Sequence, residues 1–245
     1  MNANVRLPLM ILLGAVALVA AAAAQPDEAA GKRTDKHDVI DRYIAALGGR
    51  EAIERLESRF CRGRLTDDLR SRPTPFYKEV DFEAYAAVPH RYRFDFHEEA
   101  FVERRGFDGR RGWIADSAGV RRDAEPIRTK IAFLLDPRSA LNLEAYFPGL
   151  TYMGQRSLYG TTVHALQPAD LKPEYYTLYF DVENGLLVGI GYHWEILDYR
   201  KVDGVLVPHH IVCGRKGGAS TYDFLELRHN VAADDSLFEM PVPTE

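Results

Sequence analysis

The sequence predicts a mainly β protein, of the α+β class, built on a single strongly curved antiparallel sheet that forms an unclosed half-barrel covered by helices. Three observations support this fold class. Apolar and polar residues alternate with a period of two in many short segments, turn residues separate these segments, and stretches with helical spacing lie near the start and in the middle of the chain. A sheet of about eleven strands should curl as it twists, and its concave side then needs a cover. The helical stretches are the available cover.

The N-terminus has the layout of a secretory signal peptide. Arg6 is followed by an apolar run from Leu9 to Ala24 that ends in small residues, so we expect cleavage after Ala24. The run is short for a membrane span, and a polar segment follows it at once; the alternative is an uncleaved anchor helix. We therefore expect a signal peptide at 1–24, a flexible leader at 25–36 and one half-barrel domain at 37–245.

Export determines the expected location and redox state of the chain. We expect a monomeric periplasmic protein with no transmembrane span after signal cleavage. The formal net charge of −5 gives no reason to expect nucleic acid binding, which favours a clustered basic surface. Two cysteines are too few for a disulfide scaffold. Cys61 and Cys213 could still form a single bridge in an oxidising compartment, or remain two separate buried thiols; the sequence leaves both open.

The domain is expected to begin with a broken amphipathic helix. Apolar residues recur with helical spacing from Asp38 to Leu47, and Gly48-Gly49 can end that helix in a left-handed turn. A second helical segment runs from Glu51 to Leu56. The apolar stripe of this helix must be buried on another element.

The first half of the sheet follows these helices. The clearest strand is His90–His97, where three aromatic residues alternate with charged ones. Asp108-Gly109 is a strong hairpin signal between two further strands. The strands expected here are Arg59–Leu65, Phe76–Ala86, His90–His97, Phe101–Phe107 and Arg111–Asp116.

The middle of the chain changes period and then returns to strands. Helical segments are expected at Glu125–Leu135 and Ser139–Phe147, broken at Asp136-Pro137 because proline sits at a helix boundary or first turn. Both segments are very apolar. Strands are then expected at Thr151–Ser157, Thr162–Gln167, Tyr175–Asp181, Leu186–Tyr192, Glu195–Lys201, Val205–Cys213 and Thr221–Leu227.

Five segments of the chain, in order, resemble the outer-membrane lipoprotein-sorting type of protein, which shares the fold of the periplasmic lipoprotein carrier LolA. They are YIAALGGREAI (43–53), GFDGRRGW (106–113), YFDVENGLL (179–187), DYRKVDGV (198–205) and ADDSLFEMP (233–241). The resemblance spans nearly all of the mature chain and is that of a distant relative of the carrier. It implies an unclosed, strongly curved barrel with helices over its mouth, holding acyl chains.

An apolar cavity between sheet and helices is the site that this fold would offer. The strand at 90–97 and its neighbour together offer one broad apolar face. The middle helices carry more apolar residues than one helical stripe needs. For each of them the alternative is an ordinary place in the core. The cavity candidates are Val80, Phe82, Tyr92, Phe94, Phe96, Trp113, Ile131, Leu134, Leu135 and Leu141.

No catalytic constellation accompanies this apolar material. The sequence has no H-E-x-x-H, C-x-x-C, G-x-S-x-G or P-loop motif, so we expect no enzyme, no cofactor and no metal. The adjacent His209 and His210 would point to opposite faces of a strand. The function expected is a carrier for a lipid-like ligand or acylated protein cargo, with an envelope protein as a further partner. The alternatives are a sensing module that docks to a membrane partner without transport, and a rigid protein without a ligand.

Overall fold

The computed structural model describes residues 34–70, 77–123, 130–214 and 218–242, which all belong to one compact unit. The expected signal peptide and most of the expected leader lie outside these residues. The last residue of that leader, Lys36, is already helical.

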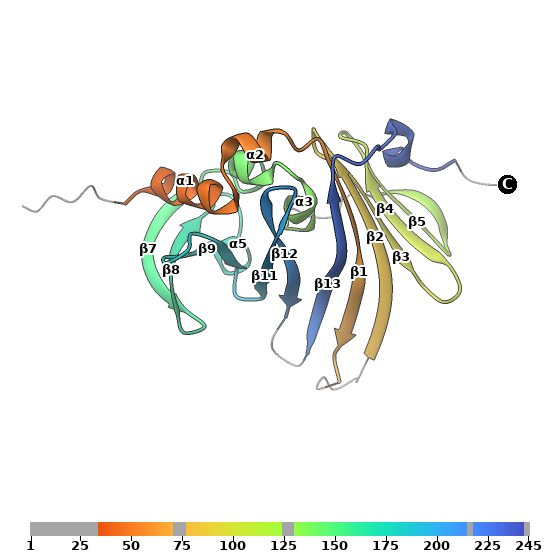
Figure 1. Ribbon diagram of the computed structural model, residues 1–245. Helices are drawn as coiled ribbons and strands as arrows, with labels where there is room; N and C mark the ends of the chain where they lie inside the picture. Colours follow the sequence, from red (N-terminus) through yellow and green to blue (C-terminus); the bar gives the residue numbers. More distant parts are fainter. Residues whose placement is uncertain (1–33, 71–76, 124–129, 215–217, 243–245) are drawn as a thin grey trace, which may run out of the picture. The chain divides into compact units, whose positions relative to one another are not determined.

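The described strands form one 13-stranded antiparallel sheet, in the order β6-β5-β4-β3-β2-β1-β13-β12-β11-β10-β9-β8-β7. Every pair of neighbours is consecutive in sequence except β1 and β13, so a chain of hairpins runs outward on each side of that pair. The sheet is strongly curved (Figure 1) and is not closed, because β6 and β7 lie at its opposite ends. The predicted half-barrel of antiparallel strands is confirmed.

Strand bounds follow the expected pattern closely. The first group is β1 (Ser58–Asp68), β2 (Tyr77–Ala87), β3 (Arg91–His97), β4 (Val102–Phe107), β5 (Gly112–Asp116) and β6 (Gly119–Asp123). The second group is β7 (Thr151–Leu158), β8 (Thr161–Gln167), β9 (Leu178–Asp181), β10 (Leu187–Ile190), β11 (Trp194–Val202), β12 (Val205–Cys213) and β13 (Ala219–His229).

Two sheet predictions were wrong in detail. Strand β6 was not expected, because its Gly-Val-Arg-Arg-Asp sequence lacks the apolar alternation of a strand with a buried face. The expected strand Tyr175–Asp181 is split into a helical turn, α5 (Pro173–Tyr176), and the strand β9. Pro173 starts that turn because its fixed φ suits the first helical position, and the Thr177 hydroxyl donates to the Pro173 carbonyl at its end.

The helices begin with α1 (Lys36–Leu47), which buries Val39, Tyr43, Ile44 and Leu47. Asp35 caps it by accepting hydrogen bonds from the backbone of the first turn. The short helices α2 (Arg50–Glu54), α3 (Lys130–Leu135), η1 (Ser139–Asn142), α4 (Leu143–Tyr146) and η2 (Asp235–Phe238) follow along the chain. In Figure 1, α1 and α2 lie across the top of the sheet and α3 lies beside its inner face.

The middle helices differ from the expected segments in length. Residues 124–129 of the expected helix Glu125–Leu135 lie outside the described part, and α3 covers the rest. The expected segment Ser139–Phe147 is divided into η1 and α4. The break at Asp136-Pro137 lies where it was expected, and the Asp136 carboxylate accepts a hydrogen bond from the Arg138 backbone there.

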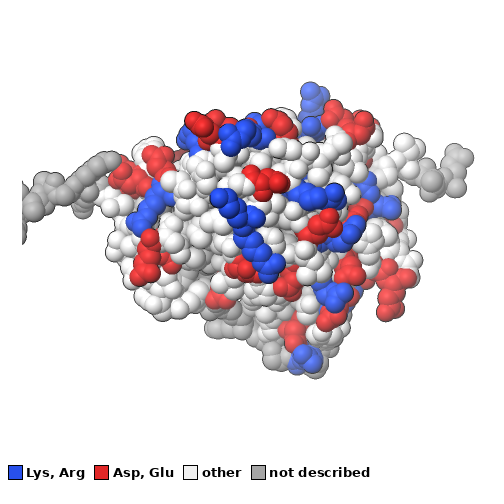
Figure 2. Space-filling model, in the orientation of Figure 1, with Lys and Arg blue, Asp and Glu red and all other residues white. Residues whose placement is uncertain are grey.

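The outer face of the sheet is polar and charge-paired. Arg62 of β1 bonds to Glu83 of β2 at 2.8 Å and to Glu226 of β13 at 3.3 Å, and Arg64 bonds to Asp81 at 2.9 Å. Acidic and basic side chains are interspersed over the surface in Figure 2. Opposite charges on neighbouring strands favour this pairing and keep the face solvated.

A bridge between Cys61 and Cys213, which the sequence left open, is not formed. Both cysteines are free. Cys61 lies opposite Leu227 of β13, whereas Cys213 lies opposite Ser220 on the other side of that strand. The offset along β13 alone is about 20 Å at the usual rise per strand residue, far beyond the span of a disulfide.

Both thiols are therefore expected to stay reduced in the native protein, even after isolation from an oxidising compartment. Burial raises the pKa of Cys61 to about 12 and that of Cys213 to about 12, so little thiolate is present at neutral pH. A thiol reagent should label Cys61 only after unfolding. The check is intact mass under non-reducing conditions, before and after denaturation with the reagent. A native mass lower by two hydrogens, with no labelling after unfolding, would indicate a disulfide. That result would contradict the separation of the two cysteines.

Candidate functional site: a cavity on the concave face

Strand alternation fixes which side chains face the inside of the curve. On β3, Tyr92 and Phe94 are buried in the main apolar core, and Phe96 packs against that core. Arg93, between them, points to the other face and bonds to Asp95. The same face of β2 presents Phe82, whose Cα partner is Phe96. The concave face of β1–β3 is therefore the aromatic side of the sheet.

A glycine on β1 lets the aromatic layer sit deep. Gly63 is the Cα partner of Phe82, and a Cβ on Gly63 would lie 2.6 Å from Cζ of the Phe82 ring and 2.2 Å from the Asp223 carbonyl oxygen. The Phe82 ring occupies that space and is fully buried. The rings of Phe94 and Phe96 stack beside it with centroids 4.6 Å apart. Such close packing gives a rigid floor.

A cavity of about 580 Å³ lies above this floor. Its walls come from β1 to β4, from β13 and from the start of α3. This volume is within the range of about 300–1,000 Å³ that is typical of small-molecule sites. The residues that line it are Leu65, Asp67, Lys78, Val80, Phe94, Phe96, Glu98, Glu103, Arg105, Ile131 and Tyr222.

The structure brings four of the sequence candidates together at this cavity. Val80, Phe94, Phe96 and Ile131 line it. The other candidates pack around or away from it. Phe82, Tyr92 and Leu135 are buried in the apolar core, and Leu141 packs against that core. Leu134 lines a separate void of about 30 Å³ between the helices and the second half of the sheet.

Trp113 lies on the opposite face of the sheet from the cavity. Its Cα partner is Gly106, and a Cβ on Gly106 would lie 2.3 Å from the indole ring. Gly106 pairs in turn with Arg93, whose side chain is on the outer face. The Trp113 Nε1–H donates to the Phe238 carbonyl oxygen at 2.7 Å, so this side chain anchors η2 to the sheet. Trp113 therefore cannot be a cavity residue while η2 is in place.

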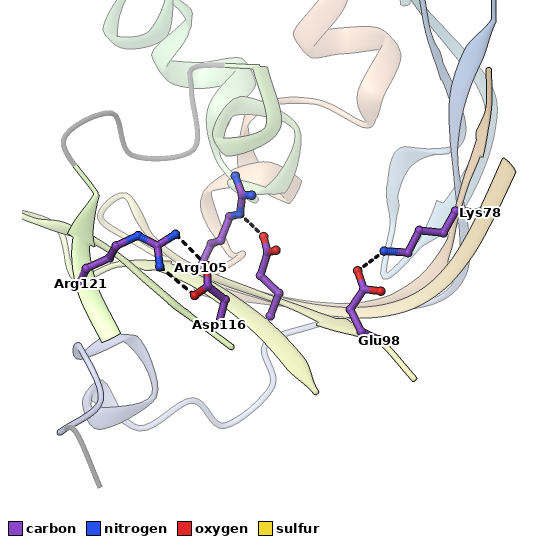
Figure 3. A network of polar contacts seen from close by, with 6 residues as sticks. Lys78, Glu98, Arg105, Asp116 and Arg121 are labelled. Carbon is purple, nitrogen blue, oxygen red and sulfur yellow. Dashed lines mark hydrogen bonds and ion pairs between the residues drawn. The ribbon is translucent and has the colours of Figure 1, made fainter. Parts of the chain in front are cut away.

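A charged wall borders the aromatic floor on the same face of the sheet and was not expected from the sequence. Figure 3 shows its three ion pairs: Lys78 with Glu98, Arg105 with Glu103, and Arg121 with Asp116. The Arg105 Nε donates to Glu103 at 2.6 Å. Charged residues at every second position of a strand are also typical of a face exposed to solvent, so the sequence pattern alone does not indicate a cavity wall. The register between β3 and β4 would have identified them, because Glu103 and Arg105 are the Cα partners of Phe96 and Phe94.

The charged wall is held in a fixed geometry next to β6. Arg121 donates to both oxygens of Asp116, at 2.8 and 2.7 Å. Hydrogen bonds from Arg121, and from the backbone of Ala118, hold the pKa of Asp116 down at about 2. This carboxylate therefore stays ionised at any pH at which the protein would work.

The helical cover is attached to the sheet by cations. The buried Arg59 of β1 donates to the Leu134 carbonyl at 2.8 Å, and Arg138 donates to the Leu56 carbonyl at 2.7 Å. The Lys130 ammonium lies 5.0 Å from the ring centroid of Tyr176 and 5.2 Å from that of Trp194. Cation–π contacts of this length are attractive when partly desolvated. Together these contacts fix α3 over the concave face.

Within the described ranges there is no group of three or more His, Cys, Asp or Glu side chains that could hold a metal ion. Nor does any helix in that part of the chain have the length and apolar character to cross a membrane.

The fold is LolA-like. No family model and no curated protein matches the sequence. A DUF1329 family protein from Desulfovibrio piger superposes with a TM-score of 0.56 at 14% identity, covering 83% of this chain and 96% of that chain. A LolA superfamily protein from Nitrosomonas europaea gives 0.56 at 12% identity, covering 84% and 98%.

A third solved structure agrees with these two. An outer membrane lipoprotein-sorting protein domain from Vibrio parahaemolyticus superposes with a TM-score of 0.55 at 10% identity, covering 82% of this chain and 94% of that chain. At these identities the likeness concerns the fold alone. The predicted fold resemblance is confirmed.

The attachment of the cover through Arg59 predicts a pH dependence of stability. The Arg59 Nε–H donates to Nε2 of His229 at 3.2 Å, which requires a neutral imidazole there. Burial, and then the Arg59 charge, lower the pKa of His229 to about 4. The unfolded chain takes up this proton near pH 6.5, so it binds more protons than the folded chain between about pH 6.5 and pH 4. Stability is thus complete above that window and falls as the pH decreases through it.

Lowering the pH from 7 to 5 should cost about 1–2 kcal/mol of the free energy of unfolding, allowing for partial solvent screening. His229→Gln keeps an acceptor for Arg59 but cannot titrate, so its stability should change less over the same range. Burial also lowers the pKa of His164. The free energy of unfolding of both proteins therefore keeps some dependence on pH. Urea denaturation at several pH values measures the difference. Parallel slopes for the wild type and the variant would show that His229 does not titrate as argued.

Proposed function

We propose that this chain is a periplasmic binding or carrier protein for a lipid-like or acylated ligand, held between the curved sheet and α3. The observation that carries the proposal is the cavity of about 580 Å³ on the concave face. Its apolar floor continues the main core, yet Phe96 and Ile131 remain only partly buried. An apolar ligand in the cavity would cover the parts of these side chains that remain exposed.

The energetics are adequate for a single alkyl chain. Each buried CH₂ group gains about 0.8 kcal/mol, so roughly ten of them gain about 8 kcal/mol before the costs of association. After part of that gain is offset, the remaining free energy corresponds to a dissociation constant between about 1 mM and 1 µM, which is about 4–8 kcal/mol. Binding of this kind needs no covalent step.

The location and the cargo class are supported from two directions. The first 24 residues have the pattern of a signal peptide, which directs export. The similar structure from Vibrio parahaemolyticus is described as an outer membrane lipoprotein-sorting protein domain. For this chain we infer an envelope location, a lipid or acylated protein as cargo, and an envelope protein that delivers or receives it. A carrier must exchange its cargo between donor and acceptor, whereas a sensor would instead form a stable complex that changes with ligand.

The first test is whether the protein binds apolar molecules. The full chain, expressed with its own N-terminus and isolated from the cell envelope, should release an acylated species on solvent extraction. After that extraction it should bind the neutral fluorescent probe N-phenyl-1-naphthylamine. Native mass spectrometry and probe titration measure the two properties. A protein that carries no acylated species and does not take up the probe would refute the proposed function.

A cavity variant tests where the probe binds. Ile131→Asn places an amide on the apolar wall, and we expect the dissociation constant of the probe to rise about tenfold because one large apolar contact is lost. The matched control is Leu225→Asn, because Leu225 is 69% exposed on β13 and is not a cavity residue. Thermal unfolding of both variants shows whether the fold survives. Equal probe affinity for the two variants would place the probe outside the cavity.

A further inference from the structure

We propose that the cavity selects ligands that carry an ammonium group beside their apolar part, and that Asp67 is the residue that recognises it. This inference rests on the proposed function, because it names the chemical class of the ligand for the same cavity. The sheet register places the Asp67 carboxylate opposite a lysine, yet among the described residues it has no hydrogen-bond or ion-pair partner.

Asp67 lies on the concave side of β1 and is a lining residue of the cavity. Its Cα partners are Lys78 of β2 and Ser220 of β13. An aspartate directly across from a lysine on an antiparallel neighbour usually pairs with it. Here the Lys78 ammonium instead donates to Glu98. The half-buried Asp67 carboxylate makes no hydrogen bond or ion pair with any residue that the structure describes.

The charges of the cavity lining do not balance. Three carboxylates line it, on Asp67, Glu98 and Glu103, against two cations, on Lys78 and Arg105. Glu98 and Glu103 are each paired with one of those cations, so the excess negative charge is that of Asp67. The nearby Lys130 does not line the cavity and lies over Tyr176 and Trp194.

The surroundings of Asp67 suit an ammonium group. Tyr222 is also a lining residue, and it is the Cα partner of Leu65, two positions from Asp67 on the same side of β1. A carboxylate next to an aromatic face attracts an ammonium through both charge and cation–π contact. An alkyl chain attached to that ammonium can then lie along Val80 and Phe96 on the floor. An anionic head group in the same place would be repelled by the unpaired carboxylate.

The experiment compares three ligands with the same chain length and different charge. Dodecylamine, dodecanol and dodecanoate compete, below micelle-forming concentrations, with N-phenyl-1-naphthylamine bound to the full chain at neutral pH. We expect dodecylamine to displace the probe at a concentration about fivefold below that of dodecanol, since a partly exposed ion pair in water is worth about that factor. Dodecanoate should be the weakest competitor, and added salt should reduce both differences.

Two variants assign the selectivity to Asp67. Asp67→Asn should abolish the preference for dodecylamine while leaving the affinity for dodecanol unchanged. Lys78→Met should increase that preference, because it leaves Glu98 unpaired as well. The control is Asp81→Asn, which removes the same charge from the outer face, where Asp81 pairs with Arg64. Circular dichroism and thermal unfolding confirm that each variant is folded.

The outcomes separate this inference from the proposed function. Probe binding with equal displacement by all three ligands, or a preference for dodecylamine that survives in Asp67→Asn, overturns the ammonium site and leaves the apolar site standing. A stronger effect of dodecanoate than of dodecylamine also overturns it. Failure of the wild type to bind the probe overturns both.

Discussion

The pairing of β1 with β13 is the interaction on which the rest of the structure depends. It joins the first strand to the last and unites two series of hairpins into one sheet. Ten residues of β1, from Arg59 to Asp68, have partners on β13, and the register shifts between Arg62 and Gly63. A bulge at that point increases local twist and bend. The aromatic floor lies there, since Phe82 packs over Gly63, so the register shift bends the sheet beneath the aromatic layer.

Periodicity predicted the floor of the cavity better than its wall. Alternation in the segment 90–97 correctly places Tyr92, Phe94 and Phe96 on one inward face, because aromatic side chains on a strand have few other places to go. It cannot tell that Glu103 and Arg105 share that face, since charged residues at period two look the same whether they line a cavity or meet solvent. Their place depends on pairing between strands, which a single sequence does not encode locally.

The remaining differences have local causes. Trp113 was a cavity candidate as a large apolar side chain, but the register through Gly106 to Arg93 places it on the outer face. Whether Cys61 and Cys213 pair depends on the strand order and register, which the spacing of the two cysteines in the sequence does not give. Among the described residues, the void between the helices and the second half of the sheet is about 30 Å³, against about 580 Å³ for the cavity over the first half. Fold resemblance could not have distinguished these halves, because it describes the backbone and not how well each part is packed.

The position of β13 at the centre of the sheet also has a kinetic consequence. The strand that joins the two halves of the sheet is the last of the described strands to be synthesised, and its partner β1 precedes it by about 160 residues of chain, which makes this contact highly non-local. Hairpins on either side can form as they emerge, but β1 keeps one edge unpaired until β13 arrives. The sheet therefore stays divided into two series of hairpins until β13 is available to pair with β1.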